Sequence, residues 1–455
     1  MSRILTEGKV GLQLVRLTLP MVGGVFAIVA FNLADTFFVG QLGTLPLAAV
    51  SFTFPVVLLL GSLAMGLGIG ASSVISRAIG EGDRDRVCRF TTNSLLLALL
   101  VVFLFVCLGL LTIDPLFALL GATPEELPLI RDYMKIWYFG MVFLVVPMVG
   151  NSAIRAAGNT GTPSLIMTMA AGLNIALDPL LIFGWDGIPR LELQGSALAT
   201  VIARAMTLVA SLLVLHFKER LLSLRWPRLL EMLWCWKDIM QVGVPAAMVQ
   251  IITPISIGVI TALLATFGAE AVAAFGVASR VESLATIATM ALSASIGPFV
   301  GQNWGAKAYV RVRRSLQLSL KFSIGWGLFV ALLLLPGAPW IAGQFNPNPN
   351  VIAIATRYLW IVPISYGGAG IIQVASSAFN ALGKPLPAVV MSIVRTGVLY
   401  IPLAYLGAQF IGIIGVFFAA SISNLLVGIA AYVWNQQTCT AKIVATQAST
   451  LPIAN

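Results

Sequence analysis

Twelve long runs of mostly apolar residues constrain this chain more than any other feature of its sequence. Each run exceeds the roughly 20 residues that an α-helix needs to cross a bilayer. Lipid offers the backbone no hydrogen-bond partners, and the runs are continuous instead of alternating, so spanning helices are predicted and a β-barrel is excluded. The predicted spans are 14–39, 46–72, 91–113, 133–154, 163–184, 195–216, 240–266, 271–298, 318–341, 357–379, 386–408 and 410–434.

The charge balance supports this fold class and gives the expected topology. Only 10% of the residues are charged, against about 25% in soluble domains. The net charge of +10 could suggest nucleic-acid binding, but its placement indicates membrane topology. Positive charges cluster in alternate connecting segments, which predicts both termini in the cytoplasm of a bacterial inner membrane. These segments hold, for example, Arg84, Arg86, Arg89, Lys307, Arg311 and Arg313, whereas the opposite ones hold Arg131, Lys135, Arg190 and Arg357.

The chain resembles itself when it is shifted so that Pro20 falls on Pro245. At this one offset the other matched pairs include Tyr133 with Tyr358, Gly43 with Gly268, Gly80 with Gly305, and Gly158 with Gly383. Because six helices separate the partners, the repeat is parallel and predicts two six-helix bundles around a central cavity. The predicted parts are an N-lobe (1–216), a cytoplasmic linker (217–239), a C-lobe (240–434) and a cytoplasmic tail (435–455). Such duplicated bundles are typical of secondary transporters that work by alternating access.

Two carboxylates lie within predicted spans of the first half. A charge at the bilayer centre costs at least about 2.5–3.5 kcal/mol, so Asp35 and Asp178 are candidate functional residues. Asn174 shares a helix face with Asp178 because it lies four residues earlier. Thr200 lies at a compatible depth in the next span. These four residues predict an ion- or proton-binding site, while capping or hydrogen bonding in kinked helices is the structural alternative.

The repeat shows that this site is a specialisation of the first half. The partners of Asp35, Asn174 and Asp178 are Ile260, Leu399 and Leu403. In the second half, Gln250, Arg280 and Glu282 are candidates for the cavity wall or for substrate binding. Pro20 and Pro245 lie inside spans, where proline removes a hydrogen bond and favours a kink that could act as a hinge.

Several motifs argue against catalysis and cofactor binding. Gly66–Gly70 contains three alternating glycines but is followed by no Lys-Ser/Thr, so close helix packing is predicted instead of a phosphate loop. The four cysteines are widely spaced and form no metal or disulfide framework. We therefore expect no cofactor, no metal other than a coupling Na⁺, and no enzyme activity. The expected driving force is an ion gradient.

The order and spacing of these motifs resemble the multidrug and toxic compound extrusion (MATE) family over about residues 10–435. The resemblance is carried by Leu19-Pro20 and by residues 34–40, 47–51, 80–83, 154–160, 173–179 and 195–200. It implies export of varied, often cationic and amphipathic organic compounds in exchange for H⁺ or Na⁺. We expect a monomer. Acidic residues in the first and fifth helices look like the DinF-like branch, whose coupling site matches Asp35, Asn174 and Asp178, with Thr200 less securely matched. Other branches carry an acidic residue in the seventh helix, where this chain has Gln250, Thr253 and Ser256.

Two other functions remain open from the sequence. A lipid-linked oligosaccharide flippase would share the twelve-helix plan but should line its cavity with several Arg or Lys residues, and only Arg204, Arg280 and Arg395 lie in the central parts of the predicted spans. An intramembrane aspartyl protease would use Asp35 and Asp178 as a dyad, but its Tyr-Asp and Gly-x-Gly-Asp patterns are missing. For a transporter, H⁺ is favoured over Na⁺, because two neighbouring carboxylates at low dielectric disfavour double ionisation.

Overall fold

The structure, a computed structural model, is helical throughout the part of the chain that it describes, residues 5–42, 44–184, 189–223 and 228–450. Eleven helices in these residues are long and apolar enough to cross a membrane. A twelfth span forms if α8 (Ala269–Ala285) and α9 (Ile287–Gly305) count as one bent pair. The prediction of an all-α membrane protein with twelve spans is confirmed.

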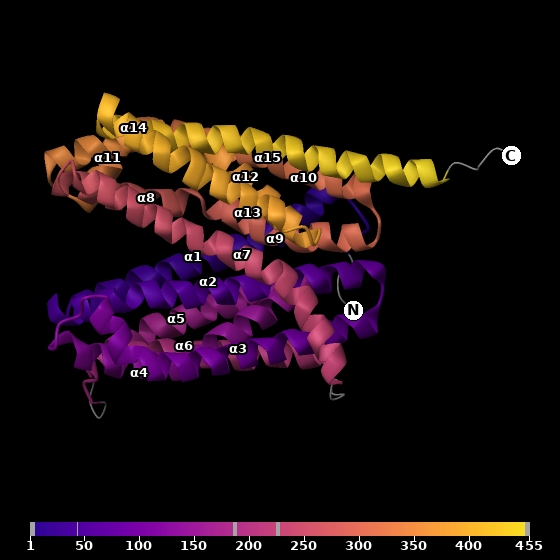
Figure 1. Ribbon diagram of the computed structural model, residues 1–455, viewed down its shortest axis with the longest axis horizontal. Coiled ribbons are helices and arrows are strands. Elements are labelled where there is room, and N and C mark those ends of the chain that lie inside the picture. Colours follow the sequence, from indigo (N-terminus) through magenta and orange to yellow (C-terminus); the bar gives the residue numbers. More distant parts are fainter. Residues whose placement is uncertain (1–4, 43, 185–188, 224–227, 451–455) are drawn as a thin grey trace. The chain divides into compact units, whose positions relative to one another are not determined.

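The remaining helices follow in chain order (Figure 1). They are α1 (Val10–Gly40), α2 (Thr44–Glu81), α3 (Arg84–Leu119), α4 (Glu126–Ala156), α5 (Gly161–Phe183), α6 (Glu192–Leu213) with the π-helical turn η1 (Val214–Lys218), α7 (Leu229–Ala265), α10 (Tyr309–Phe345), α11 (Pro349–Ile361) joined by the 3-10 turn η2 (Val362–Ser365) to α12 (Tyr366–Ala381), α13 (Leu386–Ile393) joined by the π-helix η3 (Val394–Tyr400) to α14 (Ile401–Ile411), and α15 (Ile413–Thr450).

The eighth span, predicted as one continuous helix over 271–298, is bent by 48° between α8 and α9. The hydroxyls of Ser283, Thr286 and Thr289 each donate to a backbone carbonyl three or four residues earlier. Such bonds from Ser and Thr side chains compete with the helical ladder and bend helices. The bend is therefore encoded locally, by a cluster of hydroxyl residues that hydropathy does not detect.

Two predicted boundaries also change. The linker was predicted over 217–239, but α7 begins at Leu229, so the last part of that range is helical; residues 224–227 lie outside the described part. The tail was predicted from residue 435, but α15 continues to Thr450, and residues 451–455 lie outside the described part. Asn435 and Cys439 are buried at 2% and 0% exposure, so tertiary packing extends this helix past its apolar run.

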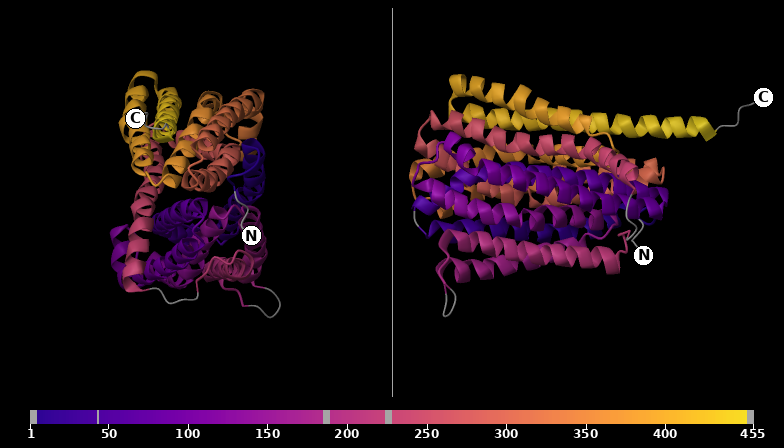
Figure 2. Two further views of the ribbon diagram at one scale, coloured as in Figure 1. Left: turned by 90° about the vertical axis from the view of Figure 1, so that its right-hand side faces the viewer. Right: turned by 60° about the horizontal axis from the view of Figure 1, so that its bottom comes forward.

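The chain divides into two compact units, each with helices that run side by side along a common direction (Figure 2). Unit 1 consists mainly of Gly23–Ile79 and Asp83–Ala247, and unit 2 of Ile4–Val22, Gly80–Gly82 and Met248–Asn455. The first part of α1 thus belongs to unit 2, and the first part of α7 belongs to unit 1. The two crossing points, after Val22 and after Ala247, occupy equivalent positions of the repeat, because each follows its repeated proline by two residues.

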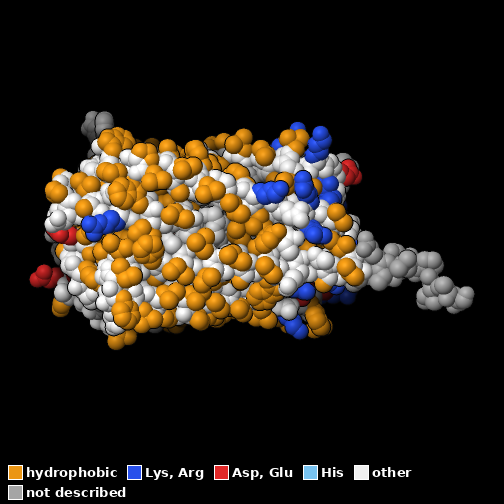
Figure 3. Space-filling view, turned by 90° about the horizontal axis from the view of Figure 1, so that it is seen from above, with side chains coloured by type: hydrophobic (Ala, Val, Ile, Leu, Met, Phe, Trp, Pro, Cys, Tyr) orange, Lys and Arg blue, Asp and Glu red, His pale blue; other side chains and the backbone are white. Residues whose placement is uncertain are grey.

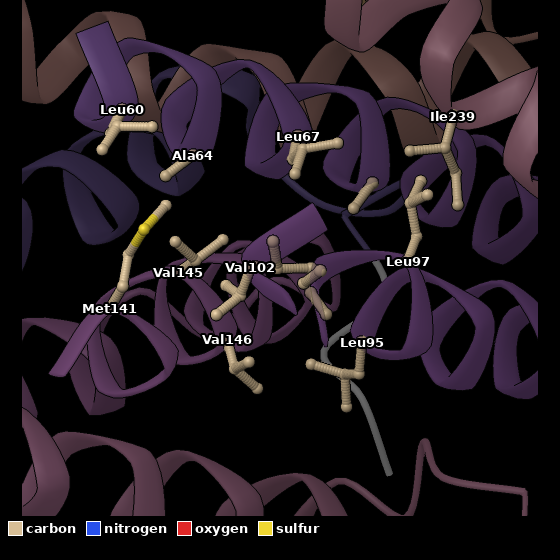
Figure 4. Packing of buried hydrophobic residues seen from close by; sticks show 14 of the residues in the cluster. Leu60, Ala64, Leu67, Leu95, Leu97, Val102, Met141, Val145, Val146 and Ile239 are labelled. Carbon is tan, nitrogen blue, oxygen red and sulfur yellow. The ribbon is translucent and has the colours of Figure 1, made fainter. Parts of the chain in front are cut away.

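The core of unit 1 packs α2, α3 and α4 through Leu67, Val102 and Val145 (Figure 4). On α2, a Cβ atom at Gly66 would lie 2.5 Å from the Gly243 carbonyl oxygen, and one at Gly70 would lie 2.4 Å from the Ile239 carbonyl oxygen. Only glycine allows α2 and α7 to approach so closely. The prediction that Gly66–Gly70 serves helix packing is confirmed.

The surface of unit 2 has the distribution that a bilayer requires. Hydrophobic side chains are spread over the middle of the face in Figure 3, and most of its Lys and Arg side chains gather toward one end. Arg313 and Arg314, in the first turns of α10, are exposed. An apolar belt that ends in basic residues matches the interface between hydrocarbon and headgroups.

Candidate functional site

The candidate site of unit 1 is built on the α5–α6 hairpin. Leu191 N–H donates to the Leu181 carbonyl at 3.1 Å, which fixes the register of the two helices. A Cβ atom on Gly195 would lie 2.3 Å from the same carbonyl oxygen, so the helices approach to backbone contact. This register places Asn174 of α5 opposite Thr200 of α6.

Asn174, Asp178 and Thr200 form one hydrogen-bonded group. With the Asn174 amide oxygen facing Thr200, that oxygen accepts from Thr200 N–H at 3.2 Å and from Oγ1 at 3.3 Å. The Asn174 amide nitrogen then donates to Asp178 Oδ2 at 2.9 Å. This orientation gives every facing atom a donor or acceptor of the right kind. Asn174 and Asp178 are both fully buried, at 0% exposure.

The other carboxylate oxygen of Asp178 has no partner. Asp178 Oδ1 is buried and accepts no hydrogen bond from any described residue. Buried polar atoms are nearly always paired, and an orphan carboxylate oxygen is especially costly. Binding a proton or a small cation would remove this cost, so the atom marks where an ion could enter the site.

Asp35 joins the group from α1, which sequence reasoning predicted only as compatible in depth. Ser196 Oγ donates to Asp35 Oδ1 at 2.8 Å, and the carboxylate of Asp35 interacts electrostatically with that of Asp178. Asp35 is half-buried, unlike Asp178. The site therefore holds one enclosed carboxylate and one that is more accessible.

Three residues of the site, Ser196, Arg204 and Tyr133, were not assigned to it from the sequence. Ser196 and Arg204 lie four residues before and after Thr200 on one face of α6, a spacing that could have identified them. Arg204 lies 6.0 Å from the ring centroid of Phe31 and interacts electrostatically with Asp35 and Tyr133. Tyr133 was noted only as a partner in the repeat. Arg204 balances one of the two negative charges.

The candidates of the second half lie in unit 2. Glu282 is half-buried and accepts a hydrogen bond from Tyr358 Oη, whereas Arg280 is exposed and Gln250 half-buried. Tyr358 is the repeat partner of Tyr133, so each unit pairs a carboxylate with the same tyrosine position. Pro20 and Pro245 both lie within continuous helices, just before the points where α1 and α7 cross between units.

Comparison with known protein families gives a match that repeats along the chain. The MatE family model matches residues 20–180 and again residues 245–406. The two matches begin at Pro20 and Pro245, which are the prolines that the self-comparison of the sequence pairs. Together they cover more than half of the chain. The first match includes Asp35, Asn174 and Asp178 and ends before α6.

Individual relatives extend over nearly the whole chain. A protein named FAD transporter from Shewanella oneidensis is 41% identical over 450 residues, which cover 98% of this chain and 99% of the relative. The probable multidrug resistance protein YoeA of Bacillus subtilis is 27% identical and covers 88% of each chain. The Vibrio cholerae MATE transporter VcmN, crystallised in a bent form, superposes with a TM-score of 0.90 at 33% identity, covering 96% of this chain and 98% of that one.

Proposed function

We propose that this chain, which belongs to the MATE family of membrane transporters, is an exporter. It exports organic molecules in exchange for an ion bound at Asp35 and Asp178. The observation that carries this proposal is the orphan oxygen of Asp178, fully buried beside a second carboxylate. A carboxylate with a permanent structural role would be expected to have partners for both of its oxygens. A site that is filled and emptied during each cycle must have one unfilled state.

The coupling ion that fits these contacts best is H⁺. The Asn174 oxygen and the Thr200 hydroxyl already hydrogen-bond each other, and Ser196 already donates to Asp35. A Na⁺ ion would have to break several of these bonds to collect oxygen ligands, whereas a proton needs only the free oxygen of Asp178. These features also support placement in the DinF-like branch.

A pH gradient alone should therefore drive transport. In proteoliposomes with an acidic lumen and Na⁺-free buffer, substrate added outside should accumulate up to about tenfold per pH unit and per proton exchanged. Nigericin should abolish the accumulation. Transport that requires added Na⁺ and ignores the pH gradient would contradict proton coupling.

Alternating access is supported by the paths of α1 and α7. Each helix begins in one unit and ends in the other, and each crosses just after a proline. Proline weakens the helical ladder because it lacks an N–H donor. Binding or release of the ion at Asp35, which lies on the unit 1 part of α1, could thus be transmitted along this helix to unit 2.

We propose that the protein works this way as a monomer in a bacterial inner membrane, with both termini in the cytoplasm.

The substrate that the comparisons favour is flavin adenine dinucleotide. The relative named for FAD transport shares 41% identity, whereas the relatives named for multidrug resistance or multidrug export share 24–27%. FAD carries a diphosphate, and three arginines, Arg204, Arg280 and Arg395, lie in the central parts of the predicted spans. Amphipathic cations, the substrates first expected from the family resemblance, form the alternative. Three such arginines are few for a flippase of large anionic lipids.

The two substrate classes can be separated in one experiment. Proteoliposomes under the acid-inside gradient should accumulate FAD, while ethidium should accumulate to a much smaller extent. Protein-free liposomes provide the baseline. After external flavin is removed on a desalting column, lumenal FAD is released with detergent and read by the rise in fluorescence when phosphodiesterase cleaves it to FMN and AMP. Strong ethidium uptake without FAD uptake would show that the protein is a multidrug exporter instead.

A further inference from the structure

A second polar cluster, partly buried, lies in unit 2 around Glu282. Tyr358 Oη donates to Glu282 Oε2. Arg395, Tyr366 and Tyr400 all interact electrostatically with Glu282. Glu282 and Arg395 are separated by more than an ion-pair distance, since no salt bridge joins them among the described residues. The cluster contains one carboxylate, one guanidinium and three phenols from four different helical segments.

The π-helix η3 explains how two of these groups face the same point. Arg395 and Tyr400 lie five residues apart, and in an α-helix, at about 100° per residue, they would point about 140° apart. In a π-helix the i to i+5 hydrogen bond brings such residues onto one side. π-Helical turns are rare and are frequently found at functional sites. The π-helix η3 therefore places the side chains of Arg395 and Tyr400 on the same side.

The cluster has more hydrogen-bond donors than acceptors. Arg395 makes no hydrogen bond or ion pair with any residue in the described part of the chain, although it lies within a spanning helix. Tyr366 is 2% exposed, and its hydroxyl has no partner among the described residues. A half-buried guanidinium without a hydrogen-bond partner and a buried phenol without one are both costly within a membrane-spanning region. Their presence suggests that an acceptor binds there during the transport cycle.

The charges indicate an anion. The single carboxylate, Glu282, is already held by Tyr358 and balanced by Arg395, so a cation would gain little and would meet the guanidinium. A phosphate oxygen can accept from Arg395 in bidentate geometry and from a phenol at the same time. The repeat partners of Arg395, Tyr366 and Glu282 are Ala170, Met141 and Val57, so these residues are not part of the shared scaffold.

We propose that Arg395, Tyr366 and Tyr400 form an anion subsite that binds a phosphate group of the transported substrate, with Glu282 as the counter-charge of Arg395 in the empty state. This inference rests on the proposed function, because it assigns a phosphate-bearing substrate to the exporter. It adds the residues that recognise the phosphate. It also predicts that Arg395→Gln weakens the binding of a phosphate-bearing ligand, whereas Glu282→Gln strengthens it.

Binding to the purified full chain in phosphatidylcholine nanodiscs tests the subsite. The probes are FAD, riboflavin, which has the flavin ring without phosphate, and ADP, which has the diphosphate without flavin. Arg395→Gln should weaken FAD and ADP binding by about tenfold or more and leave riboflavin binding unchanged. Arg395→Lys should restore part of the loss. Arg357→Gln, which removes an exposed charge from α11 of the same unit, is the matched control and should bind like the wild type.

Two further variants separate recognition from structure. Tyr366→Phe removes a hydroxyl that has no partner among the described residues, so Tm should not fall, while ADP binding should weaken severalfold. Glu282→Gln should strengthen ADP binding severalfold, because Arg395 loses its competing anion. A merely structural cluster would give the reverse pattern, with lower Tm and no selective change for phosphate-bearing probes.

The outcomes distinguish this inference from the substrate proposal. ADP binding that depends on Arg395, without FAD transport, would support the subsite and refute FAD as substrate. Loss of riboflavin and FAD binding to an equal extent in Arg395→Gln, or no ADP binding by the wild type, would overturn the subsite. Nanodiscs with phosphatidylglycerol provide the last arm. If this lipid occupied the cluster and soluble phosphates did not, the substrate assignment would be wrong.

Discussion

Asp178→Asn is expected to abolish ion-coupled export while leaving insertion and folding intact. The neutral isostere keeps the size of the side chain and can still bond Asn174, but it has no carboxylate to bind and release a proton. Asp35→Asn should have the same effect, since it removes the second carboxylate from the group bonded by Ser196. Accumulation under a pH gradient should fall to the protein-free baseline.

The control for this prediction is Asp132→Asn, the same substitution at an exposed carboxylate of α4 in the same unit. It should transport at the wild-type rate. Expression and size-exclusion profiles of all three variants should match the wild type. Full export by either Asp35→Asn or Asp178→Asn at normal expression would move the coupling site away from unit 1.

Gly195→Val should prevent unit 1 from folding normally. A Cβ atom there would lie 2.3 Å from the Leu181 carbonyl oxygen and 2.9 Å from Ile182 N, and backbone atoms inside a helix cannot move aside as a flexible side chain can. Overpacking of this kind costs about 1–3 kcal/mol or more. The substitution would also displace the neighbouring Ser196 from Asp35. We expect a strongly reduced yield of monodisperse protein and a lower Tm.

Gly172→Val is the matched control, because it makes the same change on α5 where no atom lies within 4 Å of the position that a Cβ atom would take. It should express near the wild-type level. If Gly195→Val were as stable and active as Gly172→Val, the close approach of α5 and α6 would not hold the site together.

Some contacts of the candidate site could be predicted because they depend on local spacing. Asn174 and Asp178 lie one helical turn apart, and any α-helix places them on one face. The partnership of Ser196 with Asp35 could not be predicted in the same way. It depends on the approach of α1 to α6, two helices that lie far apart in the sequence and meet only in the folded unit.

Irregular helices limited the prediction of the unit 2 cluster. Arg395 and Tyr400 do not share a face under α-helical periodicity, so periodicity alone gives no reason to connect them. The π-helix that joins them depends on side-chain packing and hydrogen bonding in the folded unit. Glu282 could be identified as unusual from the sequence, but its partner Tyr358 could not.

The sequence by itself determined that this is a membrane protein with twelve spans and an internal parallel repeat, because hydrophobic length and self-similarity are properties of the chain alone. It also determined that Asp35 and Asp178 are exceptional, since charge within lipid is costly wherever the helix packs. Only the tertiary structure decided which groups surround each charge, and that Asp178 Oδ1 and the Tyr366 hydroxyl have no hydrogen-bond partner among the described residues. These facts depend on which side chains from distant helices are in contact, and hydropathy carries no information about such tertiary contacts.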